Sequence, residues 1–131
     1  ALGEISGTGA IVWDYDRDTP YVPSPLLYKN TLYFLKSNNG ILSSFDARTG
    51  EVNYTQQRLG DIQGVYASPV AAADRVYLAG RNGVVVVLEH GREFKMLATN
   101  RLDDGFDASP AIVGGEIYLR GMQFLYCIAA E

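Results

Sequence analysis

The stretch 24–33, SPLLYKNTLY, returns twice along the chain, as SPVAAADRVY at 68–77 and as SPAIVGGEIY at 109–118. Each copy starts with Ser-Pro, continues with short apolar residues, and ends on a tyrosine nine residues after the serine. The copies start about 40 residues apart, a period typical of stacked or radially arranged modules. The residues that carry the repeat are Ser24, Pro25, Tyr33, Ser68, Pro69, Tyr77, Ser109, Pro110 and Tyr118.

The first unit has the pattern of a four-stranded antiparallel meander. Two apolar, β-prone runs are separated by Lys29-Asn30, a break of hairpin length. Asn39-Gly40 then predicts a turn before a third run, because both residues tolerate positive φ. A second turn at 46–50 leads into a stretch that alternates polar and apolar residues, as an edge strand does. The four predicted strands are residues 26–28, 32–35, 41–45 and 51–55.

The other units follow the same plan, although the last is shorter. The second has predicted strands at 69–72, 75–79, 84–88 and 93–98, and the third at 111–113, 116–120 and 124–128. Before the first unit, the apolar segment 10–15 (AIVWDY) is predicted as a single strand. No window has a sustained apolar period of 3.6 residues, so we expect an all-β chain.

A sequence signature then suggests a family. Residues 44–54 (SFDARTGEVNY) resemble the signature A-x-D-x-x-T-G-x-x-x-W of the quinoprotein-like (PQQ-repeat) β-propellers, and residues 8–13 (TGAIVW) match its second half. The last unit resembles the closing blade of bacterial members. The resemblance implies a β-propeller fragment of about three four-stranded antiparallel blades, of the quinoprotein alcohol dehydrogenase-like type within the wider WD40/YVTN-like group. Its signature residues here are Trp13, Asp46, Thr49, Gly50 and Tyr54.

By this resemblance the chain is expected to form one domain, residues 1–131. It contains an outer strand (10–15), a blade (24–56), a second blade (68–98) and a three-stranded blade (109–128). In this family the signature tryptophan packs against the next blade beside the Thr-Gly turn, so Trp13 and Tyr54 are expected to be structural aromatics.

The edges of such a fragment are expected to matter. Propellers close with about four to eight blades, so three blades from one copy do not make a ring. Residues 10–15 of a second copy could supply the strand that the last blade lacks, because exposed edges pair with other chains. We therefore expect self-association through edge strands, with an open monomeric arc as the alternative.

Composition and charge restrict the partners. The chain has 15 acidic and 11 basic residues and a net charge of −4, without a basic cluster, so nucleic acid is not an expected partner. No apolar run approaches the roughly 20 residues that cross a bilayer, and no signal segment is evident. The chain starts at Ala1 without a methionine, so a targeting segment upstream would not be seen. A periplasmic or extracellular location is implied by the resemblance alone.

The cofactor of the family is not expected in this chain. Many quinoprotein enzymes cover pyrroloquinoline quinone (PQQ) with a disulfide of adjacent cysteines and hold calcium beside it. Cys127 is the only cysteine of this chain, which excludes that disulfide. No catalytic, cofactor-binding or metal-binding residue is therefore predicted.

Three polar features remain as weaker candidates, and each also has an ordinary structural explanation. Asp14, Asp16 and Asp18 have the spacing of a calcium loop, but Thr19 replaces its glycine and Pro25 its glutamate. The single histidine, His90, lies in a predicted hairpin, and the sequence places no partner beside it. The cluster Asp103, Asp104 and Asp107 is expected in an exposed turn, where propellers can bind ligands.

Two functions follow from the resemblance. The first is a non-catalytic propeller scaffold whose loops or edges bind a protein or a carbohydrate, similar in architecture to the bacterial outer-membrane assembly propeller. The alternative is part of a PQQ-dependent oxidoreductase whose quinone site lies outside this chain. A bound quinone chromophore would distinguish the second from the first.

Overall fold

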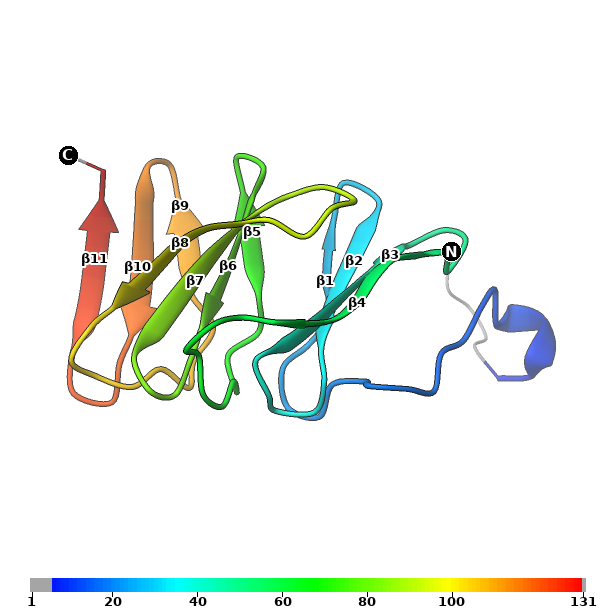
Figure 1. Cartoon of the computed structure of the whole chain (residues 1–131), viewed down its shortest axis with the longest axis horizontal. Helices are drawn as coiled ribbons and strands as arrows, with labels where there is room; N and C mark the ends of the chain where they lie inside the picture. The colour runs from blue at the N-terminus through cyan, green and yellow to red at the C-terminus, as the bar shows by residue number, and fades with distance from the viewer. Residues whose placement is uncertain (1–5, 131) are drawn as a thin grey trace.

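Three antiparallel β-sheets follow one another along the molecule in the computed structural model, which describes residues 6–130 (Figure 1). The first sheet contains β1 (Leu26–Tyr28), β2 (Thr31–Leu35), β3 (Ile41–Asp46) and β4 (Val52–Arg58). The second contains β5 (Val70–Ala72), β6 (Arg75–Ala79), β7 (Val84–Glu89) and β8 (Met96–Arg101). The third contains β9 (Ala111–Val113), β10 (Glu116–Arg120) and β11 (Leu125–Ala129).

The predicted all-β class is confirmed. In the described part of the chain the only helical element is a short 3₁₀ turn, Thr8–Ala10, and no helix there is long and apolar enough to cross a membrane. In every sheet the strands are ordered as they follow in sequence, so each is a simple meander. This topology agrees with the short turns that the sequence places between its apolar runs.

The repeated tyrosines occupy one register position in all three sheets. Each lies opposite the first residue of the preceding strand, in the pairs Leu26↔Tyr33, Val70↔Tyr77 and Ala111↔Tyr118. The nine-residue spacing from serine to tyrosine therefore corresponds to a fixed hairpin geometry in each unit.

The repeated serines connect one sheet to the next. The backbone N–H of Ser24 donates to Oγ of Ser68, and the N–H of Ser68 donates to Oγ of Ser109, both at 2.9 Å. Each serine lies two residues before the first strand of its sheet, and β5 contacts both β1 and β9. The serine of the repeat thus provides an acceptor for the neighbouring unit, which a proline or alanine could not do.

Two apolar clusters lie between the sheets. The cluster between the first and second sheets includes Tyr33, Leu35, Leu42, Val76, Leu78, Val84, Val86 and Leu88. The cluster between the second and third sheets includes Ala67, Ala79, Val85, Phe106 and Leu119. Because β7 lies in the central sheet, its successive valines point alternately into the two clusters, and both faces are buried. This explains why β7 is a continuous run of apolar residues.

The predicted strand at residues 10–15 is not formed. After the 3₁₀ turn, the chain from 11 to 16 belongs to no strand, and no described strand pairs with it. Apolar β-prone residues become a strand only when another strand satisfies their backbone groups. Side chains hold the segment instead, because the rings of Trp13 and Tyr15 pack on Phe45 of β3.

Three predicted strand boundaries differ from the structure by three residues and several others by one; one of the three is the end of β8, which lies at Arg101 and not at residue 98. The last strand of the first sheet continues to Arg58, beyond the predicted end at residue 55. The strand predicted at 93–98 begins only at Met96, because the N–H of Glu89 donates to the carbonyl of Lys95 and closes a longer turn than His90-Gly91 alone.

Candidate functional site

The signature residues of the first sheet form a turn that holds the tryptophan of the preceding segment. Oδ1 of Asp46 accepts the N–H groups of Arg48 (2.9 Å) and Thr49 (3.0 Å). The N–H of Thr49 is the main cause that lowers the pKa of the Asp46 carboxyl. Gly50 has φ +74°, and a Cβ there would lie 2.8 Å from Cδ2 of Trp13. The signature glycine is therefore needed both for the turn and for close approach of the indole.

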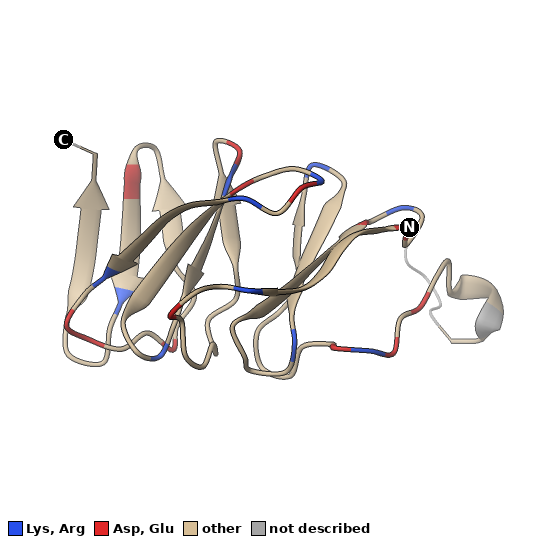
Figure 2. Cartoon of the chain, viewed as in Figure 1, with Lys and Arg blue, Asp and Glu red and all other residues tan. Residues whose placement is uncertain are grey.

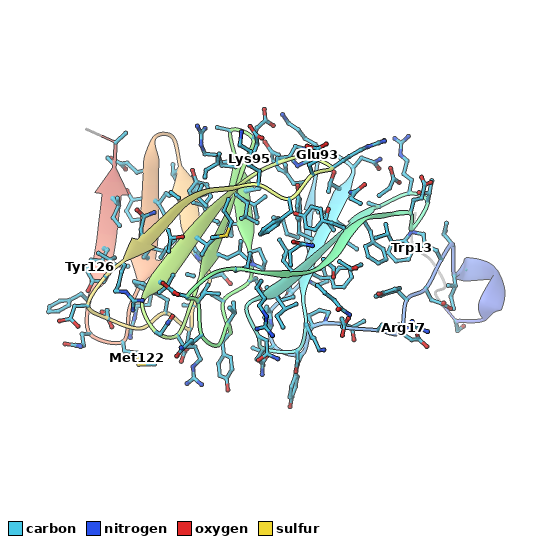
Figure 3. The ribbon with its side chains drawn as sticks, viewed as in Figure 1. Trp13, Arg17, Glu93, Lys95, Met122 and Tyr126 are labelled. Carbon is cyan, nitrogen blue, oxygen red and sulfur yellow. The ribbon has the colours of Figure 1, made fainter. Side chains whose placement is uncertain are left out.

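The indole is also fixed by a hydrogen bond. Nε1 of Trp13 donates to the carbonyl oxygen of Ala47 at 2.9 Å, at the end of the first sheet where Figure 3 places the ring. Tyr54 has the corresponding place one unit later, because its ring packs edge-on against Phe94 in the connection between β7 and β8, with centroids 5.5 Å apart. Burial raises the pKa of Tyr54, so its hydroxyl stays protonated. Both aromatics are thus engaged in packing on the sheet that follows them.

His90 has partners that its position in the sequence does not suggest. The hydroxyl of Tyr33, whose side chain is fully buried, lies 2.7 Å from Nδ1 of His90 and accepts the N–H of Gly91 at 3.2 Å. The ring of Tyr28 packs edge-on at 4.9 Å. Since the phenol oxygen accepts from Gly91, its proton can go to Nδ1, which suits an imidazole protonated at Nε2. The contacts join the first sheet to the second.

An open depression of about 500 Å³ lies beside His90, along the edge of the molecule where the β1–β2 and β5–β6 turns lie (Figure 1). The Lys29 ammonium pairs with Asp74, and this hydrogen bond lowers the pKa of the Asp74 carboxyl. Both side chains are more than half exposed, so the pair is a weak solvated contact. Figure 2 shows that charged residues gather on turns and connecting segments, whereas the strands carry few.

The aspartates with calcium-like spacing do not converge on one point. Asp18 accepts a hydrogen bond from Nε2 of Gln56 (2.7 Å) and pairs with Lys36 (3.1 Å), and these two contacts, in that order, lower its pKa. Within residues 6–130, no group of three His, Cys, Asp or Glu side chains is placed to hold a metal ion.

Asp104 organises the connection into the third sheet. Its carboxylate accepts four groups, namely the N–H of Gly105 (2.7 Å), of Phe124 (3.1 Å) and of Gln123 (3.2 Å), and the hydroxyl of Tyr126 (3.0 Å). Desolvation raises the pKa of this carboxyl, but the hydrogen bonds outweigh it, and the net pKa lies below the ordinary value. Both carboxylate oxygens of Asp104 therefore accept hydrogen bonds from the β10–β11 turn.

The two neighbouring aspartates lie elsewhere. Asp107 pairs with Nε of Arg81 at 2.9 Å, and the same guanidinium lies over the ring of Tyr66, 4.0 Å from its centroid. Asp103 is exposed. The structure thus separates three aspartates that the sequence treats as one cluster.

We expect Asp104 to make the chain sensitive to acid. Its folded pKa lies below the ordinary 3.8, so its contribution to stability is complete above that value and is lost as pH falls through the folded pKa. In urea unfolding at neutral and acid pH, Asp104→Asn should lower the free energy of unfolding at neutral pH and flatten its fall in acid. Asp103→Asn is the matched control and should change neither, and equal profiles for the two variants would contradict the role.

An apolar groove opens between the second and third sheets. Its volume is about 380 Å³, and its lining residues are Tyr77, Val85, Val87, Asn100, Arg101, Leu102, Pro110, Ile117, Leu119 and Ile128. It lies beside β11, whose outer edge is paired with no strand of residues 6–130. Leu125 and Ile128 of β11 are 71% and 40% exposed, whereas the valines of β7, which β8 pairs with, are 9% exposed or less. The groove is the position that a fourth strand would cover.

Backbone groups face outward along the same edge. The N–H of Gly121 donates to the carbonyl of Phe124, so this pair is hydrogen-bonded. From there, the residue pairs of β10 and β11 alternate between pairs that are hydrogen-bonded to each other and pairs that are not. Tyr126 and Ile128 direct their backbone groups toward β10. The N–H and C=O groups of Leu125, Cys127 and Ala129 consequently face the free edge. An extended peptide could both pair with these groups and fill the groove.

Comparisons with known proteins agree with this architecture. A family model described as "Outer membrane protein assembly factor BamB" matches residues 4–131. The crystal structure of BamB from Moraxella catarrhalis matches with a TM-score of 0.58 and 12% sequence identity, covering 80% of this chain and 41% of that one. The chain thus spans less than half the length of that protein. No curated protein sequence matches it. The likeness identifies the three sheets as blades of a β-propeller, as the sequence predicted.

Proposed function

Because this chain belongs to the outer membrane protein assembly factor BamB family of PQQ-repeat β-propellers, we propose that it is a non-catalytic scaffold that binds another protein at the groove between its second and third sheets. The observation that carries the proposal is the outward-facing backbone of β11 beside a groove of apolar side chains. Strand addition at such an edge obtains affinity from main-chain hydrogen bonds and specificity from the side-chain pockets.

The use of the polar residues supports a scaffold. Asp46 and Asp104 accept backbone N–H groups within turns, and His90 bonds to a buried tyrosine between two sheets. A catalytic acid or base must instead have an oxygen or nitrogen available to a substrate. Asp46, Asp104 and His90 therefore each already have a structural role.

Cofactor and location complete the proposal. We expect no PQQ or calcium bound by this chain, and a periplasmic location, since the family is described by its part in outer-membrane protein assembly. Adding PQQ and calcium to the chain should leave the absorption spectrum of the quinone unchanged. The oxidoreductase alternative, whose quinone site lies outside this chain, instead predicts the spectrum of a bound quinone when the full-length protein is reconstituted with quinone and calcium.

Binding to a strand-forming peptide tests the proposed site. The probe is a synthetic peptide with alternating apolar and polar residues, the pattern of an outer-membrane β-strand. In NMR titrations we expect shifts at the amides of Leu125, Cys127 and Ala129 and at the methyl groups of the groove. Ile128→Asp should weaken binding about tenfold or more, because a carboxylate in the groove would be desolvated.

A matched variant controls for general effects of charge. Leu27→Asp changes a leucine that is 64% exposed on β1, away from the groove, and should bind as the unchanged chain does. Shifts that cluster at the depression beside Lys29, Asp74 and His90 would contradict the groove. Binding of an oligosaccharide there, with no peptide binding at β11, would favour a carbohydrate partner.

A further inference from the structure

The dipeptide Asn-Gly occurs twice in the chain, at the same place in two successive units. Asn39-Gly40 lies in the turn between β2 and β3, and Asn82-Gly83 lies in the turn between β6 and β7, along the same edge of the molecule (Figure 1). A β-branched residue follows each pair, Ile41 in the first and Val84 in the second. The two sites therefore have nearly the same local sequence, and only the tertiary structure distinguishes them.

An asparagine that precedes a glycine can lose its side-chain amide without an enzyme. The backbone nitrogen of the glycine bonds to the side-chain carbonyl carbon, and ammonia leaves, which closes a five-membered succinimide ring. Water then opens the ring at one of its two carbonyls and gives aspartate or isoaspartate. Glycine favours the ring closure because it has no Cβ to hinder the approach of its nitrogen. The reaction needs a free side-chain amide, an unbonded glycine N–H and room for the ring.

The structure holds Asn82 at each of its reacting groups. Nδ2 of Asn82 donates to the carbonyl oxygen of Asp61 at 2.8 Å, and Oδ1 accepts the N–H of Gln63 at 3.3 Å. The N–H of Gly83 donates to the carbonyl oxygen of Gly80 at 3.2 Å. The amide of Asn82 is thus part of the contact between its turn and the β4–β5 connection, and ring closure would have to break all three hydrogen bonds.

The same groups of Asn39 are free within the described part of the chain. Its side chain is exposed and has no hydrogen-bond partner among residues 6–130, and the N–H of Gly40 has no acceptor there. Only the backbone of Asn39 is engaged, because its N–H donates to the carbonyl of Lys36 at 2.9 Å. An open hollow of about 420 Å³, lined by Asn39, Gly40, Arg58 and neighbouring residues, gives the side chain room to turn and water access to it.

We propose that Asn39 is a site of spontaneous deamidation in the folded chain and that Asn82 is protected from the same reaction. The bond from Cγ of Asn39 to its amide nitrogen breaks, a bond from Cγ to the nitrogen of Gly40 forms, and the hydrogen of that nitrogen leaves with the ammonia. One water then restores the N–H of Gly40 and supplies the hydroxyl of the new carboxyl group. Nothing is oxidised or reduced, and the proposal is independent of the groove at β11.

Isoaspartate at position 39 would alter a turn that is fixed on both sides. In isoaspartate the main chain passes through Cβ and Cγ of the residue, so the turn becomes one carbon longer. The N–H of Lys36 donates to the carbonyl of Ile41 across this turn, at 2.9 Å. The carbonyl of Asn38 accepts the N–H of Val65, from the connection to the second sheet, at 2.8 Å. The longer turn must disturb such contacts, so the aged protein should unfold at a lower urea concentration than the fresh protein.

Peptide mapping by mass spectrometry of the folded chain, aged in mildly alkaline buffer, tests the proposal. Trypsin places the two sites in separate peptides, residues 37–48 and 82–92. The exchange of NH₂ for OH at Asn39 should be about tenfold or more faster than at Asn82, because the hydrogen bonds of Asn82 must first be broken. An isoaspartyl methyltransferase with a labelled methyl donor should then mark the first peptide and not the second.

Ageing in guanidinium chloride separates structure from local sequence. In the unfolded chain the hydrogen bonds of Asn82 are absent, so the two sites should react at similar rates. Asn39→Ser is the matched variant, since it removes the reactive amide at an exposed position. It should be as stable as the unchanged chain when fresh, and its unfolding midpoint should not fall with ageing.

Three results would overturn the proposal. Equal rates at the two sites in the folded chain would show that the hydrogen bonds of Asn82 give no protection. A difference between the sites that persists in guanidinium chloride would assign it to the neighbouring sequence. An unchanged Asn39 in the folded chain, over a period in which the unfolded chain reacts, would show that the β2–β3 turn is too rigid for ring closure.

Discussion

Gly83→Ala is expected to lower the free energy of unfolding by about 3 kcal/mol or more. Gly83 has φ +85°, and an added Cβ would lie 2.3 Å from the carbonyl oxygen of Leu102 and 2.4 Å from that of Asp104. Both oxygens belong to the backbone that leads into the third sheet, so no rotation of a side chain relieves the contact. The hydrogen bond from the N–H of Leu102 to the carbonyl of Gly83 would be disturbed as well.

Urea unfolding of Gly83→Ala beside Gly114→Ala separates the steric clash from the cost of backbone conformation. Gly114 also has positive φ (+58°), but an added Cβ there would have no atom within 4 Å. Gly114→Ala should therefore cost only about 1 kcal/mol, the penalty for the left-handed conformation. Equal losses of unfolding free energy for the two variants would show that the backbone between β8 and β9 can move away from residue 83.

Tyr33→Ala is expected to cost about 3–5 kcal/mol of stability, the range for removing a large buried aromatic. The Tyr33 side chain is fully buried in the cluster between the first and second sheets, and its hydroxyl bonds to His90 and Gly91. Tyr33→Phe should cost only about 1 kcal/mol, because it removes the hydroxyl and leaves the packing of the ring.

Tyr118→Ala is the matched control from the same repeat. Tyr118 has the same register in the third sheet but is only partly buried, and its hydroxyl donates to Glu116. Tyr118→Ala should lower the free energy of unfolding clearly less than Tyr33→Ala does in the same urea experiment. A similar loss for the two tyrosines would mean that register, and not packing between sheets, sets their energetic role.

The strands of each unit could be predicted because their determinants are local. The Ser-Pro starts, the two-residue breaks such as Lys29-Asn30 and the glycine turns recur with the period of the repeat, and each acts within a few residues of itself. The family signature at residues 44–54 likewise describes one turn, in which Asp46 and Gly50 contact their immediate neighbours. Such patterns can be read without knowing how the units pack.

The polar candidates were harder to interpret because their partners are remote. His90 meets Tyr33 across 57 positions of sequence, and Asp104 meets the turn that contains Gln123 and Phe124. Neither spacing follows any strand or helix period, so no sequence pattern predicts these two contacts. Asp103, Asp104 and Asp107 look alike in sequence, yet only the path of the chain between two sheets gives them different partners.

The sequence by itself determined the repeat, the all-β class and the order of strands, since hairpin turns and alternating apolar residues act over short distances. Only the tertiary structure decided that residues 10–15 form no strand, because a strand exists through the hydrogen bonds of a neighbour and not through its own residues. It likewise revealed the groove beside β11, because a groove arises from the packing of two sheets, with Val85 and Ile117 on its opposite walls.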